Sequence, residues 1–452
     1  MSQSSTIKAL TELVEKQAAQ ISALLARVEN LEQELFFYKS RKNSGNSHVP
    51  PSADLGKSRR NQSLRERSGK KAGGQQGHEG STLSFPAFPD EIIIHAPLYC
   101  HCCGDGLAHV PAIALSKRQV IDIPKPVTFC TEHRTFSKTC SCGHITKGDF
   151  PVNVNAYVQY GSHIEALTAY LSVRQYMPFG RIQEFYSKVM GLELSQGGVA
   201  GMLQRFAAKA LPMYQEIKNR VETAACLGTD ETGAKINGKT HWFWTWQNEA
   251  LTFIVQSPGR GYKTIAGAFP GGLPGAVLVH DRWAPHFRCG ALQHQVCLAH
   301  LFRDLNYIAQ LHQDDWSRSL KSLLKRAIDL NNKTGYDGLS PSPARDGLEQ
   351  SLTNLLWHQL PGKDKLAVRL QKKLRKIPHH ILCFLHYNDV PPDNNGSERA
   401  IRNIKVKQKI SGSFRSLDGA NTFAVIRSVI DTTIKSGNDV FYALKLIANF
   451  SP

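Results

Sequence analysis

The sequence predicts a multidomain α/β protein with a sheet-containing core interrupted by a helical insertion. Three observations carry this prediction. Residues 7–35 follow a heptad repeat, residues 224–282 have strand periodicity, and residues 286–385 are mainly helical in pattern. At 452 residues, the chain is long enough for about three domains.

Composition favours a nucleic acid as partner. Hydrophobic residues make up 41% of the chain, which allows a sizeable core, and the net charge is +18 with a pI near 9.5. Because the basic residues are clustered, binding to an anionic partner explains them better than a merely solvated surface does. The leading candidate is nucleic acid, and the lesser one is an anionic membrane surface. We find neither a secretory signal nor an apolar run long enough to span a membrane, so we expect a cytoplasmic, nucleoid-associated bacterial protein without membrane contact.

The first predicted unit, residues 1–41, is a coiled-coil helix. β-Branched residues dominate the a positions of the heptad and leucines dominate the d positions, a pattern typical of a parallel two-stranded coiled coil. The a positions are Ile7, Val14, Ile21, Val28 and Leu35, and the d positions are Leu10, Gln17, Leu24 and Leu31. We therefore expect self-association into a dimer or larger assembly, the alternative being an amphipathic helix packed on its own domain.

Residues 42–89 form a predicted basic linker. The stretch "KNSGNSHVPPSAD" is too polar to bury a core, and the following "KSRRNQSLRERSGKK" holds seven Lys/Arg against one Glu. A flexible arm of this kind can lie along a phosphate backbone, although a plain solubilising linker has the same composition. The candidate DNA contacts in this arm are Lys57, Arg59, Arg60, Lys70 and Lys71.

Residues 90–152 are predicted to be a small β module that binds zinc. Segments such as "EIIIHAP", "RQVIDIP" and "VTFCTEHRTF" alternate like strands, and six of the ten cysteines of the chain fall here. In a chain with no secretory signal, such clustering favours a structural metal site over disulfides. The predicted zinc ligands are Cys100, Cys103, Cys140 and Cys142, with Cys102, Cys130, His101, His133 and His144 as competing ligands. The alternative is a set of reduced cysteines without metal.

Residues 153–223 are predicted to be a helical region that contacts DNA. Gly191 is a plausible end of one helix, and Ser195 is a plausible N-cap of the next. Two helices joined by a glycine turn are compatible with a helix-turn-helix, but ordinary helical packing gives the same pattern.

Residues 224–285 are predicted to be the first part of the core, residues 286–390 a helical insertion, and residues 391–452 the second part. The segments "AACLGTD", "THWFWTWQ" and "LTFIVQ" predict three strands in succession, "YKTIAGAF" a helix, and "GAVLVHD" a buried strand. Three hairpin-linked strands, a helix and another strand form the opening order of an RNase-H-like fold. Trp242, Trp244 and Trp246 recur at period two, which indicates one face of a strand and a core more often than a base-stacking platform.

Three carboxylates are the predicted catalytic residues. Asp230 and Asp281 follow apolar strands, so we expect both near strand ends, where ligands bind in open α/β sheets. Glu398 opens a later helix and could approach the same edge. Three such carboxylates can hold two Mg²⁺ or Mn²⁺ ions for phosphoryl transfer. Because neighbours on a strand point to opposite faces, we assign Asp230 to the site and a structural role to Glu231.

Basic residues follow Glu398 without an intervening acid until Asp418. The candidate phosphate contacts among them are Arg399, Arg402, Lys405 and Lys407. Upstream, Cys297 and His300 stand three apart on one helix face, as expected for residues that support the site or bind metal. A buried Cys beside a hydrogen-bonded His is an equal alternative.

The chain resembles the insertion-sequence-66 family of transposases. The resemblance extends over nearly the whole chain, from "KNSGNSHVPPSAD" and "GGQQGHEG" through "HWFWTW", "LVHDRW" and "CLAHLFRDL" to "DNNGSERAIRNIKVKQKISGSFRS". It differs from the family pattern in having Arg282 after the second Asp, and Gly396 and Ser397 before the Glu.

This resemblance implies a DDE-type transposase with an RNase-H-like core and the acidic triad Asp230, Asp281 and Glu398. Such enzymes are expected to cut at the 3′ ends of the element, to join the freed 3′-hydroxyls to target DNA, and to act with small accessory proteins of the same element. Two rivals stay open. One is a non-catalytic DNA-binding regulator, a domesticated remnant with the same fold, and the other is a nuclease that cuts without joining.

Overall fold

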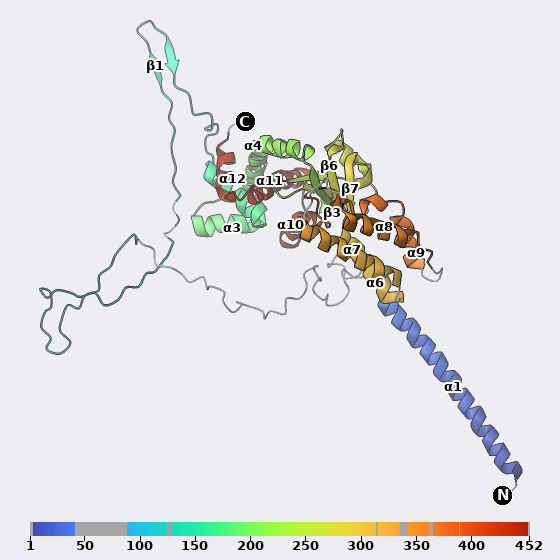
Figure 1. Cartoon of the computed structure of the whole chain (residues 1–452). Coiled ribbons are helices and arrows are strands. Elements are labelled where there is room, and N and C mark those ends of the chain that lie inside the picture. The colour runs from blue at the N-terminus through green and yellow to red at the C-terminus, as the bar shows by residue number, and fades with distance from the viewer. Residues whose placement is uncertain are drawn as a thin grey trace.

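The computed structural model describes residues 3–40, 88–123, 126, 128–312, 315–334, 342–360, 365–387 and 389–450. Its helices and strands gather in one packed body, from which a long N-terminal helix and an extended segment project (Figure 1).

A mixed sheet lies at the centre of the body, with the strand order β5-β4-β3-β6-β7. The pairs β3–β4 and β4–β5 are antiparallel, whereas β3–β6 and β6–β7 are parallel. The strands are β3 (Cys226–Ile236), β4 (Lys239–Gln247), β5 (Thr252–Ser257), β6 (Leu273–His280) and β7 (Ala291–Val296), and the helix α5 (Tyr262–Ala268) joins β5 to β6.

The strands and the helix predicted between residues 224 and 282 are therefore confirmed. Trp244 and Trp246 are fully buried, with stacked rings 6.0 Å apart, so their period-two spacing marks the core, as expected. Strand β7 was not predicted, because its residues were expected to begin the helical insertion of residues 286–390. Only its last three residues are buried, so the apolar signal of a strand is weak there.

Helices cover the sheet and close its edge. The helices α2 (Ser162–Ala169), α3 (Phe179–Met190) and α4 (Gln196–Glu222) precede the sheet, η2 (Tyr170–Arg174) continues α2, and α10 (Asn395–Ser411), α11 (Leu417–Lys435) and α12 (Val440–Asn449) follow it. Helix α11 lies along the edge strand β5, where Ser428 accepts the backbone N–H of Ile254 and Thr432 that of Thr252. These bonds satisfy donors that an exposed edge strand would leave unpaired.

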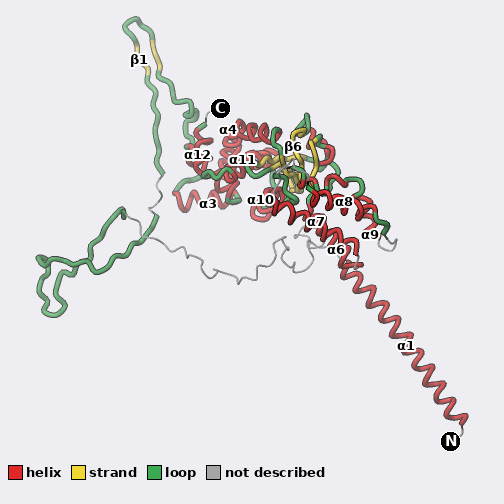
Figure 2. The backbone as a smooth tube through the Cα atoms, viewed as in Figure 1, coloured by secondary structure: helices red, strands yellow, loops and turns green. Residues whose placement is uncertain are grey.

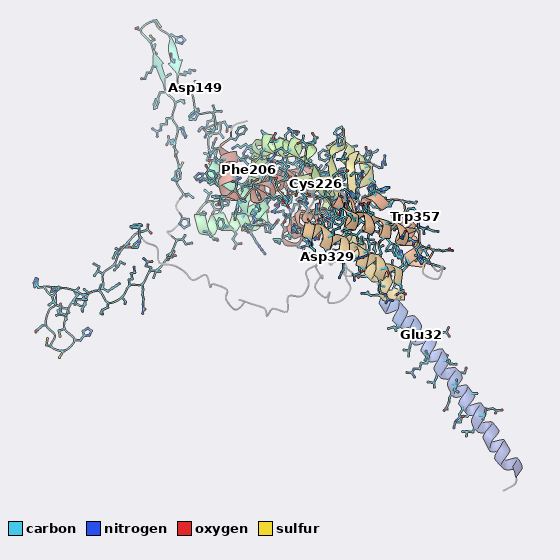
Figure 3. The ribbon with its side chains drawn as sticks, in the orientation of Figure 1. Glu32, Asp149, Phe206, Cys226, Asp329 and Trp357 are labelled. Atoms are coloured by element: carbon cyan, nitrogen blue, oxygen red, sulfur yellow. The ribbon has the colours of Figure 1, made fainter. Side chains whose placement is uncertain are left out.

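The predicted helix boundaries around α3 and α4 are confirmed. Gly191 ends α3 with a left-handed φ of 62°, and the Ser195 hydroxyl caps α4 by accepting the N–H of Gly198 at 3.0 Å. Helix α4 is buried at eight positions along its length, one of which is Phe206 (Figure 3). The pair α3–α4 is thus packed into the body, and reading of DNA by it stays a prediction.

A second helical cluster lies between β7 and α10. It consists of α6 (Leu298–His312), α7 (Asp315–Thr334), α8 (Pro343–Trp357), α9 (Lys365–Leu374) and the single turns η4 (Pro378–His380) and η5 (Cys383–Leu385), while η3 (His286–Arg288) precedes β7. Its apolar core continues from the sheet residues Val277, Val279 and Val296. In the part of the chain that the structure describes, no helix is both long and apolar enough to cross a membrane.

The N-terminal helix α1 (Gln3–Ser40) stands apart from the body except near its C-terminal end, which lies beside α6 (Figure 1). Wherever its predicted heptad seam can be described, the apolar side chains are 50–62% exposed, from Val14 to Leu35. The seam is therefore uncovered in the single chain.

The strands expected between residues 90 and 136 are not found. The described residues of this stretch form loops with one isolated bridge, between Tyr99 and Gly106, and paired strands begin just beyond it, at β1 (Ser137–Thr139) and β2 (Ile145–Lys147) (Figure 2). The alternation failed as a strand signal because a strand needs a partner and a buried face. Ile92, Ile93 and Ile94 are instead 67–81% exposed.

Candidate active site

The register of the sheet brings Asp230 and Asp281 to the same level. Strands β3 and β6 pair in parallel up to Gly228, which lies opposite Val279. If this register is extended by two residues, beyond the end of β6, Asp230 comes level with Asp281. Asp281 directly follows the end of β6, as expected. Asp230 lies inside β3, not near its end, because β3 outlasts its parallel partner and continues to Ile236 paired with β4.

Glu231 points to the other face and is engaged there. It pairs across the ladder with Trp244, and its buried carboxylate binds Arg260 Nε at 2.6 Å and His286 Nε2 at 3.1 Å. Burial alone would raise the pKa of Glu231, but His286 and Arg260 outweigh it and hold that pKa below its usual value. These contacts fit the structural role assigned to Glu231.

Glu398 lies in the first turn of α10, where the helix dipole favours a carboxylate. Three cationic or potentially cationic groups surround it at 3.8 Å: His300 Nε2 and Arg303 Nη2 from Oε1, and Arg402 Nη2 from Oε2. Its Oε1 atom is buried without a hydrogen bond from any described residue. A buried carboxylate oxygen without a hydrogen bond is suited to coordinate a metal ion.

The start of α10 is seated directly against β3 and β4. A Cβ atom at Gly228 would lie 2.6 Å from Ser397 Oγ and 2.7 Å from both Asn394 Oδ1 and Gln247 Nε2. A Cβ at Gly396 would lie 2.5 Å from Gln247 Nε2. The small residues before the Glu, noted above as a departure from the family pattern, thus allow the close approach that carries Glu398 to the sheet.

Hydrogen bonds fix this contact. Asn394 donates its side-chain amide to the carbonyl of Thr229 at 2.7 Å and its backbone N–H to Cys297 Sγ at 3.2 Å. Lys435 Nζ donates to Gln247 Oε1 at 2.8 Å, which holds the amide that faces Ser397. The position of Glu398 is therefore determined by residues from β3, β4, α11 and the turn before α6.

The carboxylates influence one another. Burial raises the pKa of Asp230 well above its usual range, and the charges of Glu231, Asp281 and Glu398 add to this effect. Like charges gathered in this way favour a cation between them. Among the described residues, no three His, Cys, Asp or Glu side chains already stand close enough to form a metal cluster. The oxygen donors fit Mg²⁺ by their chemistry, and binding would require the side chains to draw together.

The residues predicted to support the site, Cys297 and His300, and the neighbouring Arg282 each make different contacts. Cys297 is fully buried, burial raises its pKa to about 12, and its Sγ atom accepts the backbone N–H of Asn394, which fits a supporting role. His300 lies beside Glu398, as described above. Arg282 forms an ion pair with Asp304 of α6 instead of with Asp281.

The predicted phosphate contacts on α10 divide into two pairs. Arg399 and Arg402 are exposed on the same helix as Glu398. Lys405 donates to the carbonyl of Gly233 at 2.5 Å, and Lys407 lies 5.9 Å from the ring centroid of Phe179. Burial lowers the pKa of Lys407 to about 8. The five candidates in the basic arm, Lys57, Arg59, Arg60, Lys70 and Lys71, lie outside the described residues.

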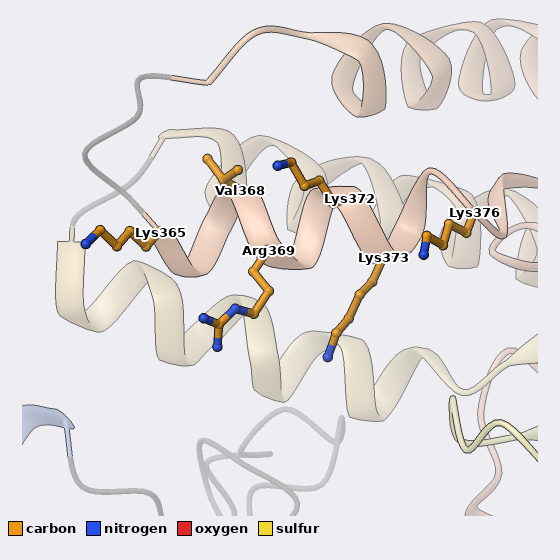
Figure 4. A pocket seen from close by; sticks show the side chains of 6 residues that line it. All are labelled: Lys365, Val368, Arg369, Lys372, Lys373 and Lys376. Carbon is orange, nitrogen blue, oxygen red and sulfur yellow. The ribbon is translucent and has the colours of Figure 1, made fainter.

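A basic surface on α9 was missed by the sequence analysis. Its cations line a shallow hollow on this helix and just beyond it, and none forms an ion pair with a described residue (Figure 4). This α9 basic face consists of Lys365, Arg369, Lys372, Lys373 and Lys376. The signal was present as cations four and three residues apart on an amphipathic helix, but it lay inside a segment treated only as an insertion.

The two predicted cysteine pairs form similar turns but lie apart. In one turn Gly104 N–H donates to the carbonyl of Cys100, and in the other Gly143 N–H donates to that of Cys140, with both glycines at positive φ. Nearby backbone N–H groups lower the pKa of Cys100 and of Cys140. The second pair sits at the β1–β2 turn on the projecting segment, on which Asp149 is labelled in Figure 3. The structure does not bring Cys100, Cys103, Cys140 and Cys142 together.

Comparison with known proteins identifies the family of the chain. The N-terminal part, residues 3–84, matches the model of a family of unknown function, DUF6444. No curated protein sequence matches the chain. The model described as Transposase IS66 family matches residues 157–422, which contain the sheet, the helical cluster and all three carboxylates. Since this match covers more than half of the sequence, the chain belongs to the IS66 family of transposases.

Proposed function

We propose that the chain is a DDE-type transposase that cleaves DNA at the ends of its element and joins the 3′-hydroxyls to target DNA. The proposal that Asp230, Asp281 and Glu398 act together is supported by the parallel register of β3 and β6, which leads toward both aspartates, and by the close seating of the start of α10 against β3 and β4. The strand order, with three antiparallel strands followed by two parallel ones, supports an RNase-H-like core.

Mg²⁺ or Mn²⁺ held by these three carboxylates would activate the attacking hydroxyl and stabilise the leaving oxygen of an in-line displacement. The residues of the chain supply the rest. Asn394 and Gln247 fix the helix that bears Glu398, while Arg260 and His286 bind the carboxylate of Glu231, and His286 Nε2 also lies 3.8 Å from Asp281 Oδ1. Arg399 and Arg402, exposed beside Glu398, are placed to bind backbone phosphates.

Other surfaces would hold DNA and a second copy of the chain. The α9 basic face offers five cations to a phosphate backbone, in addition to the predicted basic arm. The uncovered heptad seam of α1 supports dimerisation as a parallel coiled coil. The lowered pKa values of Cys100 and Cys140 favour thiolates, and we propose that their two turns close around one structural zinc ion. Accessory proteins of the element are expected from the family resemblance.

The test is a cleavage and strand-transfer assay on labelled element-end DNA with Mg²⁺ and the accessory proteins. It compares the wild type with Asp281→Asn, which keeps an oxygen that can accept the Trp283 N–H now bound to Asp281 Oδ1 at 2.9 Å. Asp346→Ala is the matched control, because this acid lies on α8 and is mostly exposed. We expect Asp281→Asn to bind DNA but to form neither cleaved nor joined products.

Retained cleavage by Asp281→Asn would refute the assignment of the triad. Binding without cleavage by every variant, wild type included, would favour the non-catalytic regulator. Cleavage without joining would favour a nuclease.

A further inference from the structure

Trp283 is held rigidly beside the candidate active site. Its backbone N–H donates to Asp281 Oδ1, and its indole N–H donates to the carbonyl of Arg260 at 3.3 Å. The Arg260 guanidinium lies 4.2 Å from the centroid of its ring. Arg260 is in turn fixed by its ion pair with Glu231 and by Trp242, whose ring centroid is 4.9 Å away. The indole therefore has a determined position.

Despite these contacts, Trp283 is 37% exposed. Trp244, Trp246 and Trp316 are at most 4% exposed, as expected for large apolar side chains with a core to fill. An indole that is fixed in position but partly exposed to solvent loses little conformational entropy when a ligand contacts it. Its position, two residues after a carboxylate proposed to act on DNA, limits which ligands can reach it.

We infer that Trp283 is a stacking platform for an unpaired base of the DNA strand beside the scissile phosphate. The inference rests on the proposed function, since it takes DNA as the ligand of the carboxylates. An aromatic ring stacks on any base, so the contact is insensitive to sequence. A base inside a duplex has both faces covered by its neighbours, so the platform selects DNA with an unpaired base at this point.

The competing role for Trp283 is structural. The ring covers Arg260 and so shields the Arg260–Glu231 ion pair from solvent. A purely structural tryptophan would matter for stability and would not discriminate between paired and unpaired DNA. This difference separates the two roles.

The experiment measures fluorescence anisotropy of two labelled probes with the full chain in EDTA. One probe is a blunt duplex, and the other is the same duplex with a fork of six unpaired thymidines. The variants are Trp283→Ala and Trp283→Phe, with Trp357→Ala as matched control. Trp357 is likewise exposed, at 56%, and has an arginine over its ring, Arg375 at 5.9 Å, but it lies at the end of α8.

We expect the wild type to prefer the forked probe and Trp283→Ala to lose about 5-fold to 150-fold of that preference, the factor equivalent to about 1–3 kcal/mol of stacking. Trp283→Phe should keep most of the preference and Trp357→Ala all of it. An unchanged preference in Trp283→Ala, an equal loss for both probes, or a wild type that does not distinguish them would overturn the inference. A wild type that binds neither probe would overturn the proposed function as well.

Discussion

Substituting alanine for Gly228 should move α10, the helix that bears Glu398, without replacing a carboxylate. The new methyl group would stand 2.6–2.7 Å from Ser397 Oγ, Asn394 Oδ1 and Gln247 Nε2, closer than any real Cβ contact. These atoms cannot swing aside freely. Asn394 is bound to the carbonyl of Thr229, and Gln247 is held by Lys435. The strain must therefore be relieved by lifting the start of α10 away from β3.

The cost can be estimated from comparable cases. Inserting a methyl group into a well-packed site destabilises by about 1–3 kcal/mol, and a displacement of about 1 Å at a catalytic group can cost about 100-fold in rate. We expect Gly228→Ala to lower the unfolding midpoint and to reduce DNA cleavage at least tenfold at a temperature where the variant is fully folded. Gly275→Ala on β6 is the matched control, because a Cβ there meets nothing within 4 Å.

The assay pairs thermal unfolding with cleavage of element-end DNA for the wild type and both variants. If Gly228→Ala unfolds and cleaves like Gly275→Ala, then α10 is not seated on β3 as described. A loss of stability with full cleavage would show that the seating does not position Glu398.

Three further predictions concern charge and metal. Because the folded pKa of Asp230 lies above its unfolded value, ionisation of this carboxyl opposes folding, so Asp230→Asn in EDTA should raise the unfolding midpoint at pH 7–8. This gain should shrink as the pH falls and vanish below about pH 3, where Asp230 is protonated in the unfolded state as well, and a lower midpoint at pH 7 would contradict the prediction. Replacing Arg369 and Lys372 of the α9 basic face by alanine should reduce the slope of log K for DNA binding against log salt concentration by about 1.8, and an unchanged slope would contradict a role of this face in binding DNA; the control Lys325→Ala on α7 should leave the slope unchanged. Cys140→Ser should abolish zinc binding measured by elemental analysis of the purified chain, and an unchanged zinc content would show that this cysteine is not a ligand.

Local signals of the sequence predicted the core well. The strands β3 to β6 follow apolar alternation or a short buried run, and the capping residues Gly191 and Ser195 mark their helix ends. These features depend on residues within one segment, whose backbone preferences act before tertiary contacts form. The three carboxylates could be proposed from local patterns as well, since Asp230 and Asp281 follow apolar runs and Glu398 is the acid at the start of a basic helical segment.

The features that escaped prediction depend on distant parts of the chain. Whether an alternating segment becomes a strand depends on a partner, which the residues around Ile93 lack and those of β7 find in β6. The level of Asp230 within β3 depends on how far β6 extends beside it. Gly396 looked like a departure from a pattern because nothing near it in sequence reveals Gln247, which arrives from β4.

The two faces of β3 explain why neighbouring acids have different roles. Asp230 lies on the face toward α10, where no described cation pairs with it and its pKa is raised. Glu231 lies on the other face, where Arg260 and His286 bind it and its pKa is lowered. One carboxylate is thus left in need of positive charge, while the next is already compensated. Since the Arg260 guanidinium also lies against the Trp283 ring, the ion pair that compensates Glu231 supports the proposed base platform beside Asp281. Loss of Glu231 should consequently affect DNA selection as well as stability, although this acid is not proposed to contact metal or substrate.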